Sequence, residues 1–259
     1  MKVYSQEPFG SSLSAEVYGL QYNKDYRGEV AWLAALAHRH GLRGSPSWLD
    51  MACGTGDHLR HAGAYFGEAA GVDLSPHMLA VARERLPDSI SLYEGDMATV
   101  RLGRKFDVVT CLFSAVSYLA TEAGVRRAVA NMVRHTLPGG LVMVQPWLHP
   151  QEFYTDNMLH PTEAKADGGE LVRRVVLHGP PAGEEGTVHM QMGFLYSRPD
   201  PEDGRLQIDA FTEDHDLALL HEDTYRQAMV DAGMQVLEVE PPPSELPDVR
   251  PLFIGRVAV

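Results

Sequence analysis

Apolar residues recur at two different spacings along the first 146 residues of the chain, and the two spacings alternate. Helical spacing, with apolar residues three and four positions apart, occurs at 29–40, 57–65, 75–85 and 121–136. Short, mostly apolar runs lie at 47–52, 69–73, 90–93, 106–113 and 141–144. Strands that alternate with helices in this way are typical of a parallel sheet with right-handed crossovers.

The pattern changes after Gln145. β-like runs follow at 171–178, 187–196 and 206–212, separated by turns rich in glycine and proline. A helix is then predicted at 222–232, and strands at 235–240 and 251–259 should close the main sheet as an antiparallel pair. We therefore expect a doubly wound, Rossmann-like α/β domain made of 29–146 and 217–259. An antiparallel β lid is inserted at 147–216, and 1–28 is aromatic-rich and irregular.

Composition and charge narrow the functional classes. The 259 residues are 44% hydrophobic and 22% charged, which is ordinary for a globular chain of one domain with an insertion. The formal net charge of −13 argues against nucleic acid or an anionic membrane as a partner. Met1–Gly10 lacks the apolar core of a signal peptide, and no run approaches the roughly 18 apolar residues of a membrane span. These features favour a cytoplasmic enzyme, and they leave a homo-oligomer open.

The cysteines and histidines of the sequence give little support for a metal site or a disulfide. The two cysteines, Cys53 and Cys111, form no CxxC pair, and the twelve histidines show no metal-ligand cluster. His58 and His61 lie three residues apart after a glycine turn, and we expect both to face solvent. No metal is therefore predicted.

The run from Asp50 to Gly56 is the strongest chemical signal. Two glycines follow a predicted strand and precede a helix, an arrangement that lets the backbone pass close to a ligand. A tight turn without a ligand is the first alternative. A nicotinamide enzyme is the second, but its fingerprint needs a glycine where Leu59 stands. A P-loop is excluded because no Gly-Lys-Ser/Thr ending follows.

Three further features follow the glycine turn in order along the chain. Asp73 ends the second strand, where a carboxylate can accept both hydroxyls of a ribose, and Gly95-Asp96-Met97 ends the third strand. Leu137-Pro138-Gly139-Gly140 ends the helix before the fifth strand. Each aspartate alone has a second interpretation as a cap or turn residue. Their joint occurrence favours a nucleoside-containing cofactor.

Together these motifs resemble the class I S-adenosylmethionine-dependent methyltransferases. The sequence is most similar to the nucleotide-sugar N-methyltransferases of antibiotic biosynthesis, of the desosamine and mycaminose type, and the lincosamide N-methyltransferases are a similar branch. The shared stretches are 23–26, 109–114, 145–147 and 252–255. The resemblance implies a small-molecule amine acceptor, such as an amino sugar. An O-methyltransferase and a non-catalytic cofactor-binding regulator remain the alternatives.

The resemblance also implies a set of cofactor-binding residues. It assigns the methionine part to the loop around Ala52, the ribose to Asp73, and the adenine to Asp96 with Met97. Residues 1–28 would form an arm that covers the cofactor, with Tyr18 and Tyr26 reaching over it, although both tyrosines could instead pack on the core. The complete predicted set is Tyr18, Tyr26, Asp50, Ala52, Cys53, Gly54, Gly56, Asp73, Leu74, Asp96, Met97 and Leu112.

The acceptor side departs from the related enzymes. They carry a tyrosine near the N-terminus and a histidine after the fourth strand, whereas this chain has Tyr118 in the histidine position, and Tyr4 or Phe9 would replace the tyrosine. A tyrosine with an ordinary pKa of about 10 is better suited to orient an amine than to act as a strong base. Tyr118 and His149 are the catalytic candidates. The substrate candidates are Phe9, Phe113, Trp147, Phe153, Arg174 and Arg250, of which the arginines would bind a phosphate or carboxylate unless they form surface salt bridges.

Overall fold

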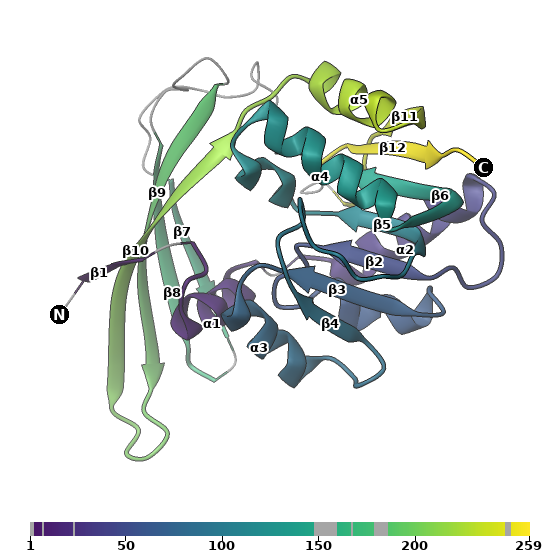
Figure 1. Ribbon diagram of the computed structural model, residues 1–259. Helices are drawn as coiled ribbons and strands as arrows, with labels where there is room; N and C mark the ends of the chain where they lie inside the picture. Colours follow the sequence, from purple (N-terminus) through teal and green to yellow (C-terminus); the bar gives the residue numbers. More distant parts are fainter. Residues whose placement is uncertain are drawn as a thin grey trace.

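Two β-sheets stand side by side in the computed structural model of the protein (Figure 1). The structure describes residues 3–6, 8–22, 24–147, 160–166, 168–178, 186–246 and 250–259. We call the seven-stranded sheet the core sheet and the five-stranded sheet the lid sheet. Among the helices of these residues, none has the length and apolar content needed to cross a membrane.

The core sheet is the expected doubly wound sheet. Its strands are β2 (Trp48–Met51), β3 (Ala69–Asp73), β4 (Ser91–Glu94), β5 (Phe106–Cys111), β6 (Thr136–Val144), β11 (Met234–Glu240) and β12 (Leu252–Val257). Their order is β11-β12-β6-β5-β2-β3-β4; the strands from β6 to β4 are parallel, and β12 and β11 add antiparallel. The strand order reverses between β2 and β5, so a ligand crevice is expected at their carboxyl ends.

Helices cover both faces of the core sheet, because neighbouring residues of a strand point to opposite sides. Trp48 and Val108 face a cluster with α2 (Tyr26–Arg39), the 3₁₀ helix η1 (Leu59–Ala64) and α3 (Pro76–Arg85). Leu49 and Val109 face the opposite cluster with α4 (Glu122–Arg134) and α5 (Glu222–Asp231). The fold class predicted from the sequence is confirmed.

The lid sheet has the strand order β1-β10-β9-β8-β7. The strands are β1 (Val3–Gln6), β7 (His160–Lys165), β8 (Leu171–His178), β9 (Thr187–Pro199) and β10 (Leu206–Ala218). All pairings are antiparallel except that of β1 with β10. Helix α1 (Ser12–Gln21) packs on this sheet through Val17, which lies in one buried cluster with Val172 and Phe211. The lid sheet therefore depends on the N-terminal segment for part of its core.

The structure corrects several predicted elements. The described part of 1–28 is not irregular, because it contains β1, α1 and the start of α2. Ser11 caps α1 by accepting a hydrogen bond from the Ser14 backbone N–H at 3.1 Å. The predicted helix at 57–65 is only the 3₁₀ helix η1, and a second 3₁₀ helix, η2 (Ala115–Leu119), follows β5.

Several strands extend beyond their predicted limits, and two of these extensions bear on the site. Strand β6 begins at Thr136, which pairs with Phe106, so Pro138-Gly139-Gly140 lies inside the strand rather than before it. Strand β10 continues six residues past Thr212, in pairing with β9. This second extension carries side chains into the candidate site.

Candidate active site

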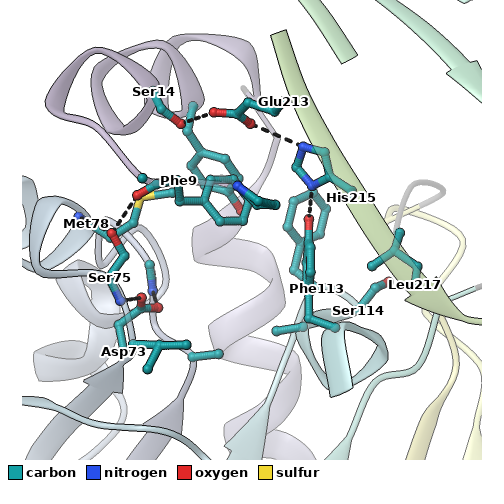
Figure 2. Close-up of a pocket in the computed structure, with 18 of the residues that line it drawn as sticks. Phe9, Ser14, Asp73, Ser75, Met78, Phe113, Ser114, Glu213, His215 and Leu217 are labelled. Atoms are coloured by element: carbon teal, nitrogen blue, oxygen red, sulfur yellow. Dashed lines mark hydrogen bonds and ion pairs between the residues drawn. The ribbon is translucent and has the colours of Figure 1, made fainter. Parts of the chain in front are cut away.

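A cavity of about 1010 Å³ lies between the carboxyl ends of the core strands and the inner face of the lid sheet. Figure 2 shows part of its lining, with Asp73 and Ser75 on the core side and Glu213 and His215 on the lid strand. The residues that line it and were predicted for the site are Phe9, Tyr18, Ala52, Gly54, Asp73, Leu74, Asp96, Met97, Leu112, Phe113, Tyr118, Trp147, Arg174 and Arg250. The structure thus brings residues from both halves of the predicted site into one cavity.

The turn after β2 has the shape that a ligand-binding backbone needs. Ala52, Gly54 and Gly56 have positive φ angles of 65°, 56° and 79°. A Cβ added at Gly54 would meet no atom of the described residues within 4 Å, so this backbone faces open space in the cavity. A Cβ at Gly56 would lie 2.6 Å from the side chain of Leu86. Gly54 therefore combines a positive φ with open space in front of it, and Gly56 is needed for the packing of Leu86.

Asp73 ties the turn to the end of β3. Its carboxylate accepts hydrogen bonds from the backbone N–H of Gly54 at 2.7 Å and of Ser75 at 2.9 Å. Burial raises the pKa of Asp73, and the backbone donors oppose that rise in part. Each carboxylate oxygen keeps further acceptor capacity, so Asp73 can also accept hydroxyl protons from a ribose. Leu74 beside it is 69% exposed and lines the cavity.

Asp96 and Met97 line the cavity beyond β4. The Asp96 carboxylate accepts from the Ala98 backbone N–H at 2.8 Å and from the Thr99 hydroxyl at 3.3 Å. Gly95 before it lets the turn close, because a Cβ there would lie 2.7 Å from Val100. Asp96 is therefore a turn residue that also faces the cavity, and the two interpretations from the sequence are compatible.

A second, small cavity of about 30 Å³ lies behind the glycine turn. Its lining includes Asp50, Cys53 and Tyr26. Asp50 is 2% exposed and accepts a hydrogen bond from the Thr110 hydroxyl at 2.7 Å, and burial raises its pKa to about 6. Tyr26 donates its hydroxyl to the Tyr22 carbonyl at 2.8 Å. Asp50 and Tyr26 are therefore each fixed beside the glycine turn by a hydrogen bond.

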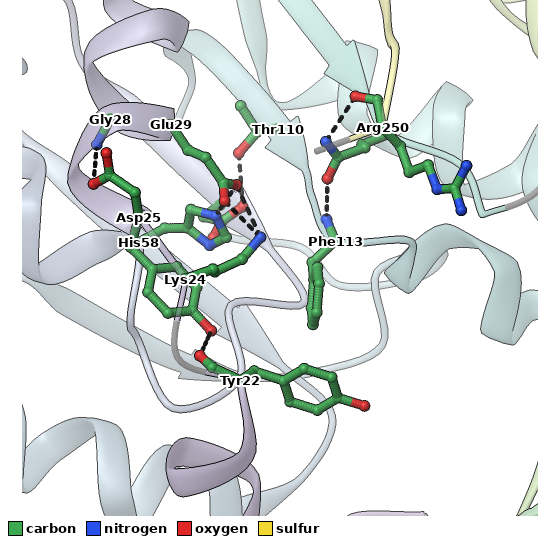
Figure 3. Close-up of polar contacts among 12 residues, drawn as sticks. Tyr22, Lys24, Asp25, Gly28, Glu29, His58, Thr110, Phe113 and Arg250 are labelled. Atoms are coloured by element: carbon green, nitrogen blue, oxygen red, sulfur yellow. Dashed lines mark hydrogen bonds and ion pairs between the residues drawn. The ribbon is translucent and has the colours of Figure 1, made fainter. Parts of the chain in front are cut away.

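A buried cluster joins the N-terminal arm to the glycine turn (Figure 3). Glu29 contacts the Lys24 Nζ at 2.8 Å and the His58 Nε2 at 2.9 Å. The Lys24 ammonium also lies 4.0 Å from the centre of the Phe113 ring. The prediction that His58 faces solvent is wrong: it is 6% exposed, because η1 turns it beneath α2 toward Glu29. His61 is partly buried.

The segment after β5 has an unusual backbone at the cavity. Phe113 and Ser114 have positive φ angles of 51° and 64°, which cost energy in residues other than glycine. Gln145 holds this conformation, because its Oε1 accepts from the Phe113 N–H at 2.6 Å. Its Nε2 donates to the Arg250 carbonyl at 3.0 Å (Figure 3). Strands β5 and β6 and the C-terminal segment are thereby joined at the site.

Phe9 and Tyr118 meet on the acceptor side. The Phe9 ring lies edge-on to Tyr118 and to Tyr18, with centroid distances of 5.8 and 5.4 Å. The Phe9 carbonyl accepts from the Ser75 hydroxyl at 2.7 Å, which places the arm beside Asp73. The Tyr118 hydroxyl lies 2.8 Å from the His215 Nδ1.

The remaining catalytic and substrate candidates divide into two groups. Trp147 lines the cavity, and its backbone N–H donates to the Ser117 hydroxyl at 3.3 Å. Arg174 lines it from the lid and donates to the Tyr22 hydroxyl at 2.7 Å. His149 and Phe153 lie outside the described residues.

Comparison with known proteins identifies the family. Residues 49–140 match the family model described as a methyltransferase domain. The chain is 38% identical over 244 residues to the dTDP-3-amino-3,6-dideoxy-alpha-D-glucopyranose N,N-dimethyltransferase of Streptomyces fradiae, covering 93% of this chain and 89% of that relative. The chain belongs to the S-adenosylmethionine-dependent N-methyltransferases. The resemblance stated from the sequence is thereby confirmed, as are the enzyme class and the cofactor.

Solved structures agree with this N-methyltransferase assignment. The crystal structure of Streptomyces venezuelae DesVI has a TM-score of 0.80 and 36% identity, covering 94% of this chain and 96% of that chain. The structure of S-adenosylmethionine-bound CalS10, an amino pentose methyltransferase from Micromonospora echinaspora, has a TM-score of 0.75 and 32% identity. That alignment covers 95% of this chain and 96% of CalS10.

Several cavity residues of this N-methyltransferase were missed from the sequence. Glu213 and His215 line the cavity from β10, and Ser14 and Tyr22 line it from the arm. An available signal was the alternation Phe211, Glu213, His215, Leu217, which puts these side chains on one face of a strand. Because the predicted strand ended at Thr212, this alternation was not recognised as part of a strand.

Asp96 gives a first test of the cofactor side. We expect Asp96→Ala to weaken binding of S-adenosylhomocysteine about tenfold, because a hydrogen-bond acceptor worth roughly 1–2 kcal/mol is lost. Asp96→Asn should lose less than threefold, since the amide oxygen still accepts. Isothermal calorimetry measures both, with Thr99→Ala as a control for the loss of the internal contact. Equal affinities for wild type and Asp96→Ala would place Asp96 outside the adenine site.

Proposed function

We propose that this enzyme transfers methyl groups from S-adenosylmethionine to the amino group of a nucleotide-linked deoxy amino sugar. The observation that carries the proposal is that one continuous cavity runs from the glycine turn to the lid sheet. Its volume of about 1010 Å³ is at the upper end of the range for one small ligand, which fits a site shared by two. The relative from Streptomyces fradiae is named as a dimethyltransferase of such a sugar nucleotide.

The residues of the turn and the strand ends support binding of the donor. S-adenosylmethionine, when bound, supplies a methyl group as an electrophile on a sulfonium. We assign Ala52 and Gly54 to its methionine part, Asp73 to its ribose, and Asp96 with Met97 to its adenine. Each of these residues lines the large cavity.

The charge distribution supports an anionic nucleotide on the acceptor. Arg174 and Arg250 line the cavity of a protein whose net charge is −13. Cations inside an otherwise acidic protein favour an anionic ligand, and a guanidinium matches phosphate oxygens with two parallel hydrogen bonds. The same net charge supports a small-molecule acceptor over a nucleic acid.

The arm is proposed to cover the donor and to form one wall of the acceptor site. Phe9 is joined to Ser75 next to Asp73, and Tyr18 contacts the Phe9 ring. An arm in this position excludes water from the reacting atoms, as lids in other enzymes do.

The proposal is tested by turnover of a defined acceptor. The purified enzyme is incubated with S-adenosylmethionine and dTDP-3-amino-3,6-dideoxy-α-D-glucose, and the products are followed by mass spectrometry. We expect successive gains of one and two methyl groups on the amino sugar. The 3-hydroxy analogue serves as the control acceptor. Methylation of the hydroxy analogue without methylation of the amine would make the enzyme an O-methyltransferase and refute the proposal.

A further inference from the structure

A chain of hydrogen-bonded polar side chains crosses the acceptor side of the cavity. The Ser14 hydroxyl donates to one oxygen of Glu213, and the other oxygen lies 3.1 Å from the His215 Nε2 (Figure 2). The His215 Nδ1 lies 2.8 Å from the Tyr118 hydroxyl. Glu213 and His215 are 2% and 1% exposed, and all four residues line the cavity. Burying these groups is costly unless each has partners, and the contacts supply them.

The relay that these contacts allow requires one arrangement of the protons. An ionised Glu213 carboxylate can only accept, so in this arrangement the His215 Nε2 carries the proton that faces it. In the neutral imidazole, Nδ1 is then an acceptor and takes the hydrogen bond from the Tyr118 hydroxyl. The Tyr118 oxygen keeps lone pairs for a proton donor in the cavity. Tyr118 is 37% exposed, so it is accessible from the cavity.

Tyr118 is suited to pass a proton on rather than to hold a negative charge. Burial raises the pKa of its hydroxyl, and the nearby Tyr22 and Glu213 raise it further, while Arg174 acts in the opposite direction. Tyr118 therefore stays protonated until it can give its proton to His215 in the same step. The imidazolium that results would be stabilised by Glu213, which Ser14 orients.

We propose that Tyr118, His215 and Glu213 form a relay that removes the proton lost by the acceptor amine. The proposal rests on the proposed function, because it requires an amine acceptor. As the nitrogen lone pair forms a bond to the methyl carbon, the bond from that carbon to the sulfonium sulfur breaks. Its electron pair stays on the sulfur of S-adenosylhomocysteine, and the nitrogen becomes an ammonium. One N–H proton passes to the Tyr118 oxygen, and the Tyr118 hydroxyl proton passes to the His215 Nδ1, so no charge stays on Tyr118. The positive charge ends on His215 beside Glu213, and solvent takes the proton after product release.

A second methylation makes the relay more important. The monomethylated product must lose a proton before its nitrogen again has a free lone pair. An enzyme with a slow relay should therefore release more of the monomethyl product.

Isosteric variants test the relay with S-adenosylmethionine and dTDP-3-amino-3,6-dideoxy-α-D-glucose. We expect His215→Gln to lower kcat about a hundredfold, the scale of general acid–base catalysis, and to raise the monomethyl fraction. Glu213→Gln and Tyr118→Phe should each lower kcat about tenfold. Affinity for S-adenosylhomocysteine should stay within about twofold in all three variants. Loss of that affinity in parallel with kcat would assign these residues a structural role and overturn the relay.

Two matched variants on the same hairpin serve as controls. His189 and Asp214 contact each other at 3.5 Å on the exposed face, where both side chains are more than one-third accessible. His189→Gln and Asp214→Asn should leave kcat and the product ratio unchanged. If His215→Gln behaves like His189→Gln, the relay is refuted.

A second measurement on the wild-type protein needs no acceptor. Ring ¹⁵N chemical shifts of His215 are recorded in the complex with S-adenosylhomocysteine, and the signal is assigned by its absence in His215→Gln. We expect the neutral tautomer with the proton on Nε2, and a shift of the Nδ1 signal in Tyr118→Phe. A proton on Nδ1 would overturn the relay. If wild type leaves the amino sugar unmodified, the proposed acceptor fails, and the tautomer still decides whether the relay is set up as described.

Discussion

Asp73→Ala is expected to lower the affinity for S-adenosylmethionine by about tenfold to a hundredfold. Two ribose hydroxyls would lose a charged acceptor, which is worth roughly 1.5–3 kcal/mol. The same substitution removes the bonds to the backbone N–H groups of Gly54 and Ser75, so the glycine turn also loses one of its ties to β3. Isothermal calorimetry with S-adenosylmethionine and with S-adenosylhomocysteine measures the effect directly.

Two further variants calibrate the effect of Asp73→Ala. Asp73→Asn keeps one accepting oxygen and should bind more tightly than Asp73→Ala. Asp88→Ala changes an exposed aspartate after α3 and should bind as wild type does. NADH should not bind to any of these proteins. Wild-type affinity in Asp73→Ala would remove Asp73 from the cofactor site.

Elements with strong local signals were predicted closely. Strand β3 and strand β8 have the bounds expected from their apolar runs. Helix α3 begins where Ser75 and Pro76 indicate, with the Ser75 hydroxyl accepting from the Met78 N–H at 3.3 Å. Such signals lie within a few residues of the element that they define, so the sequence alone is sufficient to read them.

Elements that depend on distant partners were predicted poorly. Helix α1 buries Val17 against strands β8, β9 and β10 of the lid sheet, which lie more than 150 positions away along the chain. The inward face of β10 carries Glu213 and His215, which interrupt the apolar pattern expected of a buried strand face. Those polar groups are tolerated because Ser14 and Tyr118 supply their hydrogen bonds.

The same distinction explains how much of the site could be predicted. The cofactor side is encoded in short motifs, and residues such as Gly54, Asp73 and Asp96 all line the cavity. The proposed acceptor side is assembled from the arm, η2 and the lid, and the imidazole beside Tyr118 comes from β10 rather than from the segment after β5. No spacing rule connects Tyr118 to His215 across 97 residues. His149 and Phe153 stay predictions.

Glu29→Ala is expected to be among the most destabilising single substitutions in the protein. The side chains of Glu29 and His58 are 4% and 8% exposed, and that of Lys24 is 10% exposed. Removing the carboxylate would take from the Lys24 ammonium, at a buried position, its ion pair with Glu29. Breaking a buried pair in this way costs about 3–5 kcal/mol. Urea unfolding followed by circular dichroism measures the loss, with Glu84→Ala on an exposed face of α3 as the control.

The cluster also predicts how stability depends on pH. Burial alone would raise the pKa of Glu29, but the contacts with His58 and Lys24 outweigh it, so the pKa lies below its ordinary value of 4.5. A carboxyl group with a lowered pKa in the folded state stabilises the protein above the unfolded pKa, and this contribution disappears as the pH falls through the folded value. The free energy of unfolding of wild type should therefore fall below about pH 5 more steeply than that of Glu29→Gln. If the two proteins lose stability in parallel over this range, Glu29 is not the group whose charge holds the arm against the glycine turn.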